Sequence, residues 1–178
     1  MILGIDYGAK LAGTTVIARL YEHNKVDFFS CKKGKDADQF ILNFIEENED
    51  VWLLYVDAPL SLPIVYRNKA LGNNYFYRQS DIETSAMSPM FLGGLTARAI
   101  RLSVELMKKG VKVVETYPAE LARILSLSER GYKKEGCSIV DLAAVIKKYS
   151  KFEFENDSIK NWHYFDALLC LYSAKRHE

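Results

Sequence analysis

Three apolar runs in this chain each end in an acidic residue, and this repeated arrangement limits the folds that the chain can adopt. The runs and their acids are Ile2–Ile5 with Asp6, Val51–Val56 with Asp57, and Val111–Val114 with Glu115. The unbroken run Val51–Val56 is typical of a strand that is covered on both faces. Neighbouring parallel strands expose their carboxyl ends along one edge of a sheet, where ligands bind. The sequence therefore predicts that the three acids lie along one such edge.

The first run continues into a glycine-bearing turn. We expect Gly8, close after Asp6, to turn the backbone with a positive φ and to leave room for a ligand. Gly13 opens a second run, Thr14–Leu20, whose β-branched residues suit a strand. Val26–Cys31 alternates enough to form a third strand. The N-terminal segment is thus expected to form three consecutive antiparallel strands.

Capping residues and apolar periodicity predict helices between and after these strands. The first helix is expected to be capped by Asp36 and to have an apolar face at Phe40, Ile41, Phe44 and Ile45, and the second to contain Leu95, Ala99, Leu102 and Leu106 and to end at Lys108-Lys109-Gly110. Pro118 is expected to start a helix over Ala119–Leu125, and Ser138 with Asp141 to cap a helix over Ile139–Tyr149. A last helix is expected from about Asn161 to Ala174. This order predicts an α/β fold: a mixed five-stranded sheet, three antiparallel strands then two parallel ones, with helices on both faces.

The length of 178 residues fits a single domain, residues 1–178, with an irregular insertion at about 60–92. Long irregular segments in compact domains usually serve the function, so we expect a functional insertion with short helical turns. The alternative is a packed excursion whose aromatic rings form a satellite core.

Composition limits the partners. The chain is 49% hydrophobic and 26% charged with a net charge of +1, so nucleic-acid binding would need local patches. A basic patch, Lys32-Lys33-Gly34-Lys35, follows the third expected strand. Three scattered cysteines without a Cys-x-x-Cys pair favour a reducing cytoplasm. No secretion signal is visible, and no window approaches 18 uninterrupted apolar residues, so we expect no membrane span.

A fourth acid, Asp166, lies within the apolar segment Trp162–Tyr172 and is expected to face the sheet. Burying an ionised carboxylate costs several kcal/mol unless it is paired or binds a cation. Four acids that converge on one edge would repel one another and raise each other's pKa values. Divalent cations resolve this repulsion, and oxygen ligands favour Mg²⁺ or Mn²⁺ over zinc.

Each acid also has a purely structural explanation. Asp57 before Ala-Pro can cap a turn, Glu115 can cap the helix that starts at Pro118, and Asp166 can pair with an arginine. His163, three residues before Asp166, is expected to be a packed histidine, with contact to the acids as the alternative. The joint placement of the acids, rather than any one of them, favours a metal site.

Five motifs, taken in order, resemble those of a predicted-nuclease family. They are Gly4-Ile5-Asp6-Tyr7-Gly8 with Gly13, Asp57-Ala58-Pro59-Leu60-Ser61-Leu62-Pro63, Arg78-Gln79-Ser80-Asp81, Glu115-Thr116-Tyr117-Pro118-Ala119, and Phe165-Asp166-Ala167-Leu168-Leu169-Cys170. The family is catalogued as domain of unknown function 429 and belongs to the ribonuclease H-like superfamily. The resemblance spans nearly the whole chain. Ser80 departs from it, because the family usually has a cysteine there.

The resemblance implies a ribonuclease H-like core and a metal-dependent nuclease. It implies that Asp6 is the metal ligand of the first strand, Asp57 the acid of the fourth strand and Asp166 that of the C-terminal helix. Glu115 would be a family-specific acid at the end of the fifth strand.

Two cations about 4 Å apart would cut a phosphodiester by in-line displacement, one activating a water and the other stabilising the leaving oxygen. The expected products carry a 5′-phosphate and a 3′-hydroxyl. Cationic side chains are candidates for contacts with phosphates, and aromatic rings are candidates for stacking on bases. The candidate substrate-binding residues are Lys10, Arg67, Tyr75, Tyr77, Arg78 and Asp81, which lies beside Arg78 in its motif. Whether the nucleic acid is DNA or RNA stays open, as does the oligomeric state.

Two other functions compete with the nuclease. One is a non-catalytic ribonuclease H-like domain that binds nucleic acid or a protein partner, which the near-neutral charge permits. The other is a nucleotide-phosphate enzyme of the actin and sugar-kinase type, which also opens with Asp-x-Gly before a hairpin. Such enzymes usually close two related domains on ATP.

Overall fold

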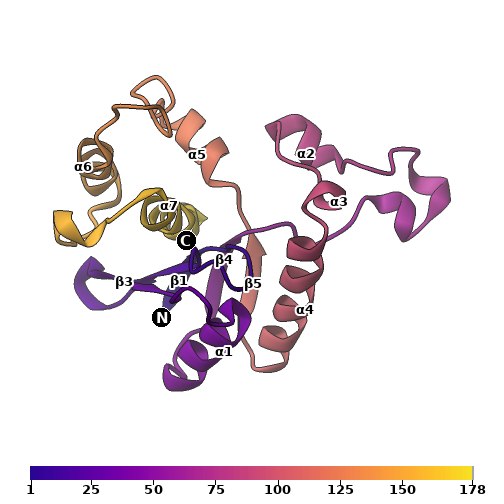
Figure 1. Ribbon diagram of the computed structural model, residues 1–178, viewed down its shortest axis with the longest axis horizontal. Helices are drawn as coiled ribbons and strands as arrows, with labels where there is room; N and C mark the ends of the chain where they lie inside the picture. The colour runs from indigo at the N-terminus through magenta and orange to yellow at the C-terminus, as the bar shows by residue number, and fades with distance from the viewer. Residues whose placement is uncertain (178) are drawn as a thin grey trace.

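The computed structural model describes residues 1–177, and a five-stranded sheet forms its centre (Figure 1). The order across the sheet is β3-β2-β1-β4-β5. The strands are β1 (Ile2–Asp6), β2 (Val16–Leu20), β3 (Val26–Ser30), β4 (Leu53–Asp57) and β5 (Lys112–Glu115). β2 pairs antiparallel with both β1 and β3, whereas β4 pairs parallel with β1 and β5. The predicted mixed sheet is therefore confirmed.

Four of the five strands end at the same edge of the sheet, which we call the carboxyl edge. β1, β4 and β5 run parallel, and β3 points the same way because two antiparallel pairings separate it from β1. The segments that follow these four strands therefore emerge together, as the sequence predicts for the acids of β1, β4 and β5.

Helices cover both faces of the sheet, as predicted (Figure 1). α1 (Ala37–Glu47) and α4 (Gly94–Lys108) cover one face, and α7 (Trp162–His177) crosses the other. α5 (Pro118–Ile124) and α6 (Ile139–Ser150) pack against α7 in the same apolar core. The predicted caps form: Asp36 accepts from the backbone N–H groups that start α1, and Ser138 accepts from Asp141 N at 3.2 Å. No helix within residues 1–177 combines the length and apolarity needed to span a membrane.

α7 lies unusually close to β1 because residue 4 is a glycine. A Cβ at Gly4 would lie 2.2 Å from the backbone nitrogen of Leu171 and 2.5 Å from the carbonyl oxygen of Ala167. Distances that short would force the two backbones apart. Gly4 thus allows α7 to pack closely against β1, and this contact brings Asp166 of α7 to the end of β1.

The turn between β1 and β2 differs from the sequence prediction. Gly13, and not Gly8, has the positive φ, at 73°. Gly8 is required for space instead, because a Cβ there would lie 2.0 Å from Thr14 Oγ1. The turn folds onto the β3–α1 connection, and a Cβ at Gly13 would lie 2.5 Å from Lys33 N.

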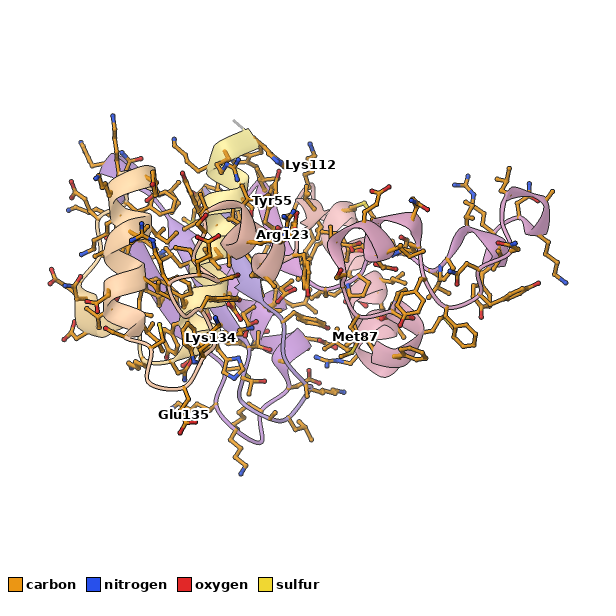
Figure 2. All side chains as sticks on the ribbon, turned by 90° about the horizontal axis from the view of Figure 1, so that it is seen from above. Tyr55, Met87, Lys112, Arg123, Lys134 and Glu135 are labelled. Carbon is orange, nitrogen blue, oxygen red and sulfur yellow. The ribbon has the colours of Figure 1, made fainter. Side chains whose placement is uncertain are left out.

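The segment between β4 and α4 forms an arm that extends away from the sheet (Figures 1 and 2). It contains the 3₁₀ turns η2 (Ile64–Tyr66) and η3 (Lys69–Leu71) and the short helices α2 (Gln79–Thr84) and α3 (Pro89–Leu92). The predicted short helical turns are thus present in this segment. Its aromatic rings contact one another but do not form a buried satellite core, because Tyr75, Phe76 and Phe91 are each about half exposed or more.

Candidate metal centre

Three carboxylates from three elements meet at the carboxyl edge. Asp6 and Asp57 are register partners at the ends of the parallel strands β1 and β4. Asp166 projects from α7, one residue before the carbonyl oxygen that approaches Gly4. Each residue offers one oxygen, and these oxygens lie within 4.8 Å of one another. The structure therefore brings together the three aspartates that the sequence singled out.

This proximity changes the acid–base behaviour of the site. Burial, together with the charges of Asp6 and Asp166, raises the pKa of Asp57 to about 8. Burial also raises the pKa of Asp166, although Lys133 and Tyr132 favour its ionised form. At neutral pH and without a divalent cation, Asp57 therefore holds a proton. A cation that replaced this proton would relieve the repulsion.

Lys133 and His163 already contact the aspartates. Lys133 Nζ lies 2.6 Å from Asp166 Oδ2, and His163 Nδ1 lies 2.8 Å from Asp6 Oδ2. Burial opposes the charge of Lys133, but Asp166, Asp57 and Asp6 outweigh it and raise the pKa of the ammonium group. The hydrogen bond to Asp6 likewise raises the pKa of His163.

Two sequence expectations change here. His163 is 44% exposed and contacts an acid, so its interpretation as a packed histidine was wrong. The sequence signal for this contact was the position of His163 three residues before Asp166, on the same helical face. Asp166 pairs with a lysine, and not with an arginine.

Sequence reasoning missed Tyr132 and Lys133 entirely. Both lie in the connection between α5 and α6, which the sequence shows only as a polar segment. The Tyr132 hydroxyl donates to Asp166 Oδ1 at 2.5 Å, and its ring packs edge-on against Trp162. The connection returns to the sheet through Tyr132, which packs against α7, and through Leu127, which is fully buried in the same core. No apolar periodicity in the sequence of this connection predicts that it packs back against the sheet.

Glu115 lies at the same edge but not in the group of three aspartates. Its register partner is Val56, one residue before Asp57, so its side chain belongs to the opposite face of the sheet. There it accepts from Arg78 Nη1 and Nη2 at 2.7 and 2.6 Å and from Leu60 N at 2.8 Å. Glu115 holds the start of the arm against β5.

Arg78 and Asp81 form the other half of this network. Arg78 Nη2 donates to Asp81 Oδ1 at 2.5 Å, and Asp81 Oδ2 accepts from Arg78 N at 2.7 Å. The Asp81 side chain is 1% exposed and that of Arg78 13%. This guanidinium is therefore saturated with carboxylates, which disfavours the predicted contact with a phosphate.

The remaining predicted substrate residues lie apart from one another. Lys10 pairs with Asp36 at 3.1 Å beside the β1–β2 turn. Arg67 and Tyr77 line a cleft of about 820 Å³ on the arm, and Tyr75 packs edge-on against Tyr66. A second cleft, of about 650 Å³, lies between the sheet and the arm and includes Asp57 in its wall. Figure 2 shows Met87, another wall residue, near this junction.

No protein-family model matches this sequence, and a comparison with curated proteins finds no significant match. The class that the structure defines is an α/β protein with a five-stranded mixed sheet and three clustered aspartates at its carboxyl edge.

Proposed function

We propose that this protein is a nuclease with a ribonuclease H-like core that hydrolyses phosphodiester bonds with Mg²⁺ or Mn²⁺. The observation that carries the proposal is the meeting of Asp6, Asp57 and Asp166 within 4.8 Å. Support for the core comes from the sheet order and from the origin of these acids: the first strand, the parallel strand beside it, and the C-terminal helix. The resemblance noted in the sequence assigns acids to the same three elements.

The aspartates fit a hard divalent cation. All three offer oxygen ligands, which Mg²⁺ and Mn²⁺ prefer. Burial first, and then the negative charges of Asp6 and Asp166, raise the pKa of Asp57, so an additional positive charge at this site would favour its ionised form. A divalent cation would be held by Asp6, Asp57 and Asp166 and would compensate those charges more fully than one ammonium group does. Glu115, bound to Arg78, is not needed for this set.

The chemistry follows from the donor set. When bound, the metal supplies a Lewis acid that activates a water nucleophile and stabilises the leaving oxygen of a phosphodiester. Asp6 and Asp57 fix two carboxylates on adjacent strands, and Asp166 closes the site from the helix. Lys133 adds positive charge beside the acids, which favours an anionic phosphate at this position, and His163 contacts Asp6. No side-chain nucleophile is required.

The substrate class that we propose is nucleic acid, either DNA or RNA, and the proposed location is the cytoplasm. All three cysteines are free thiols, which agrees with a reducing compartment. A sugar-kinase-like activity needs a second domain that closes on the nucleotide, and nothing in residues 1–177 specifically favours it.

Calorimetric titration with Mn²⁺, run beside cleavage of labelled single- and double-stranded DNA and RNA, tests the proposal. Wild type would be compared with Asp6→Asn and Asp166→Asn. Asp157→Asn, at an exposed carboxylate in the short turn η4 (Asn156–Ser158), is the matched control. We expect the first two substitutions to abolish both binding and cleavage and the control to retain both.

Other outcomes separate the alternatives. Binding of Mn²⁺ without cleavage of any of the four substrates would contradict the nuclease and keep a metal site. Absence of both would favour the non-catalytic domain, whose partner is nucleic acid or protein.

A further inference from the structure

Four exposed lysines gather on two adjacent loops at the carboxyl edge. Three follow β3 and one belongs to the turn that leaves Asp6. We call them the lysine strip: Lys10, Lys32, Lys33 and Lys35. Because β3 runs in the same direction as β1, these loops emerge at the edge of the sheet where Asp6 and Asp57 lie. The sequence shows a basic patch here but not its position beside the aspartates.

Backbone contacts hold the two loops together. Gly34 N donates to Leu11 O at 2.9 Å, and Ala37 N donates to Lys10 O at 2.9 Å. The close approach of Gly13 to Lys33 N leaves no room for a side chain between them. The strip therefore has a fixed position relative to Asp6.

The charge of the strip is largely uncompensated. Within residues 1–177, no carboxylate lies within ion-pairing distance of Lys32, Lys33 or Lys35. Asp36 is shared with Lys10. The nearby buried acid of α1, Asp38, is already held by Arg98 at 2.7 Å and Arg101 at 3.1 Å. A chain with a net charge of only +1 thus concentrates positive charge beside its acidic centre.

We infer that the lysine strip binds the phosphate backbone of a nucleic-acid strand and guides it into the metal centre. The inference rests on the proposed function, because it takes the scissile phosphate to lie at the aspartates. β3 lies two strand spacings from β1, about 10 Å. That is the length of about three nucleotide steps of a B-form strand. Phosphates a few nucleotides from the cleavage point therefore reach the strip. Its lysines offset the repulsion between the aspartates and the polyanion.

The test is fluorescence anisotropy with fluorescein-labelled dT20 and rU20, measured in EDTA so that no cleavage occurs. Wild type would be compared with the triple variant Lys32→Gln/Lys33→Gln/Lys35→Gln. The matched control is Lys108→Gln/Lys109→Gln/Lys112→Gln, three exposed lysines grouped around Gly110 at the opposite edge, where β5 begins. Figure 2 shows Lys112 on the upper side of the molecule, away from Lys134, the neighbour of Lys133.

We expect the strip variant to raise Kd at least tenfold for the strand that wild type binds. The slope of log Kd against log salt should fall by about 2, since each single-strand phosphate contact contributes about 0.7. The control should stay within twofold of wild type. A third variant, Lys32→Arg/Lys33→Arg/Lys35→Arg, should bind like wild type, because it keeps the charge. Circular dichroism melting would confirm that all variants are folded.

Each outcome decides the inference. Equal losses in the strip and control variants, or no loss in the strip variant, would overturn it, as would a failure of wild type to bind either strand. The dT20 and rU20 arms show which backbone is recognised. Strip-dependent binding without cleavage of any substrate would refute the nuclease but not the strip. Conversely, metal-dependent cleavage with unchanged KM in the strip variant would refute the strip and keep the nuclease.

Discussion

Asp6 and Asp57 are register partners across the parallel pair β1–β4, so the pairing of two strands alone brings their carboxylates together. Asp166 completes the group from α7, which can lie this close to the sheet because residue 4 is a glycine. Backbone pairing and one glycine thus build a site at which the pKa of Asp57 rises to about 8. The acidic centre is therefore expected to respond strongly to both pH and divalent cations.

Metal affinity should rise with pH until Asp57 loses its proton. Because binding must displace this proton, we expect the association constant for Mn²⁺ to increase about tenfold per pH unit below pH 8 and to level off above it. Calorimetry between pH 6 and pH 9, in two buffers of different ionisation enthalpy, measures both the affinity and the proton released. A constant affinity across this range would contradict the assignment.

The same pKa predicts a pH-dependent stability of the metal-free protein. The unfolded chain loses the Asp57 proton near its usual pKa of 3.8, whereas the folded chain holds it to about 8. The folded state therefore binds more protons between these values, and the free energy of unfolding should fall as pH rises from 4 to 8. Asp57→Asn should flatten this dependence in urea denaturation, whereas Asp157→Asn should leave it unchanged.

Lys133 is expected to compete with the metal for Asp166, because its ammonium group lies 2.6 Å from the carboxylate. Lys133→Met keeps the length of the side chain and removes its charge. We expect it to tighten Mn²⁺ binding by roughly fivefold, since a half-exposed ion pair is worth about 1 kcal/mol. The control is Lys134→Met at the adjacent exposed lysine, with no expected change. Weaker binding in Lys133→Met would show instead that the ammonium group supports the metal-bound state.

The strands and the three aspartates could be predicted because their signals are local. Apolar runs ending in Asp6 and Asp57 indicate strands, and parallel strands share their carboxyl edge. The apolar surroundings of Asp166 indicate a buried helix, and the structure confirms that Asp166 is buried. Each of these inferences depends on neighbouring residues in the sequence.

The rest of the site depends on relations that local sequence does not contain. Glu115 pairs with Val56 and not with Asp57, and a one-residue difference in register turns a side chain to the other face of a sheet. Lys133 reaches Asp166 through a long connection whose path is set by tertiary packing of Tyr132. The spatial requirement at Gly8 likewise appears only when Thr14 is placed beside it.

We expect Arg78 to keep the arm structurally ordered and not to take part in the chemistry of the site. Arg78→Ala leaves the buried Asp81 without its partner, and breaking a buried ion pair costs about 3 kcal/mol or more. We expect faster hydrogen exchange across residues 60–92 and unchanged exchange in the sheet. Arg78→Lys should not restore protection, because an ammonium group cannot bind both carboxylates in a fork. Arg67→Ala, at an exposed arginine of the same arm, serves as the control. Equal protection in Arg78→Ala and Arg67→Ala would contradict this role.

Gly4→Ala tests how the third aspartate is positioned. The new methyl group would meet the backbone of α7 at Leu171 and Ala167, which cannot rotate away as a side chain can. We expect a loss of about 1–3 kcal/mol in the free energy of unfolding and a weakening of Mn²⁺ binding, because Asp166 moves with the helix. Gly94→Ala, at a helical glycine whose added Cβ would meet no atom within 4 Å, should be neutral or slightly stabilising. Destabilisation of Gly4→Ala with unchanged Mn²⁺ affinity would mean that the site tolerates a shift of α7, and that Asp6 and Asp57 alone set the affinity.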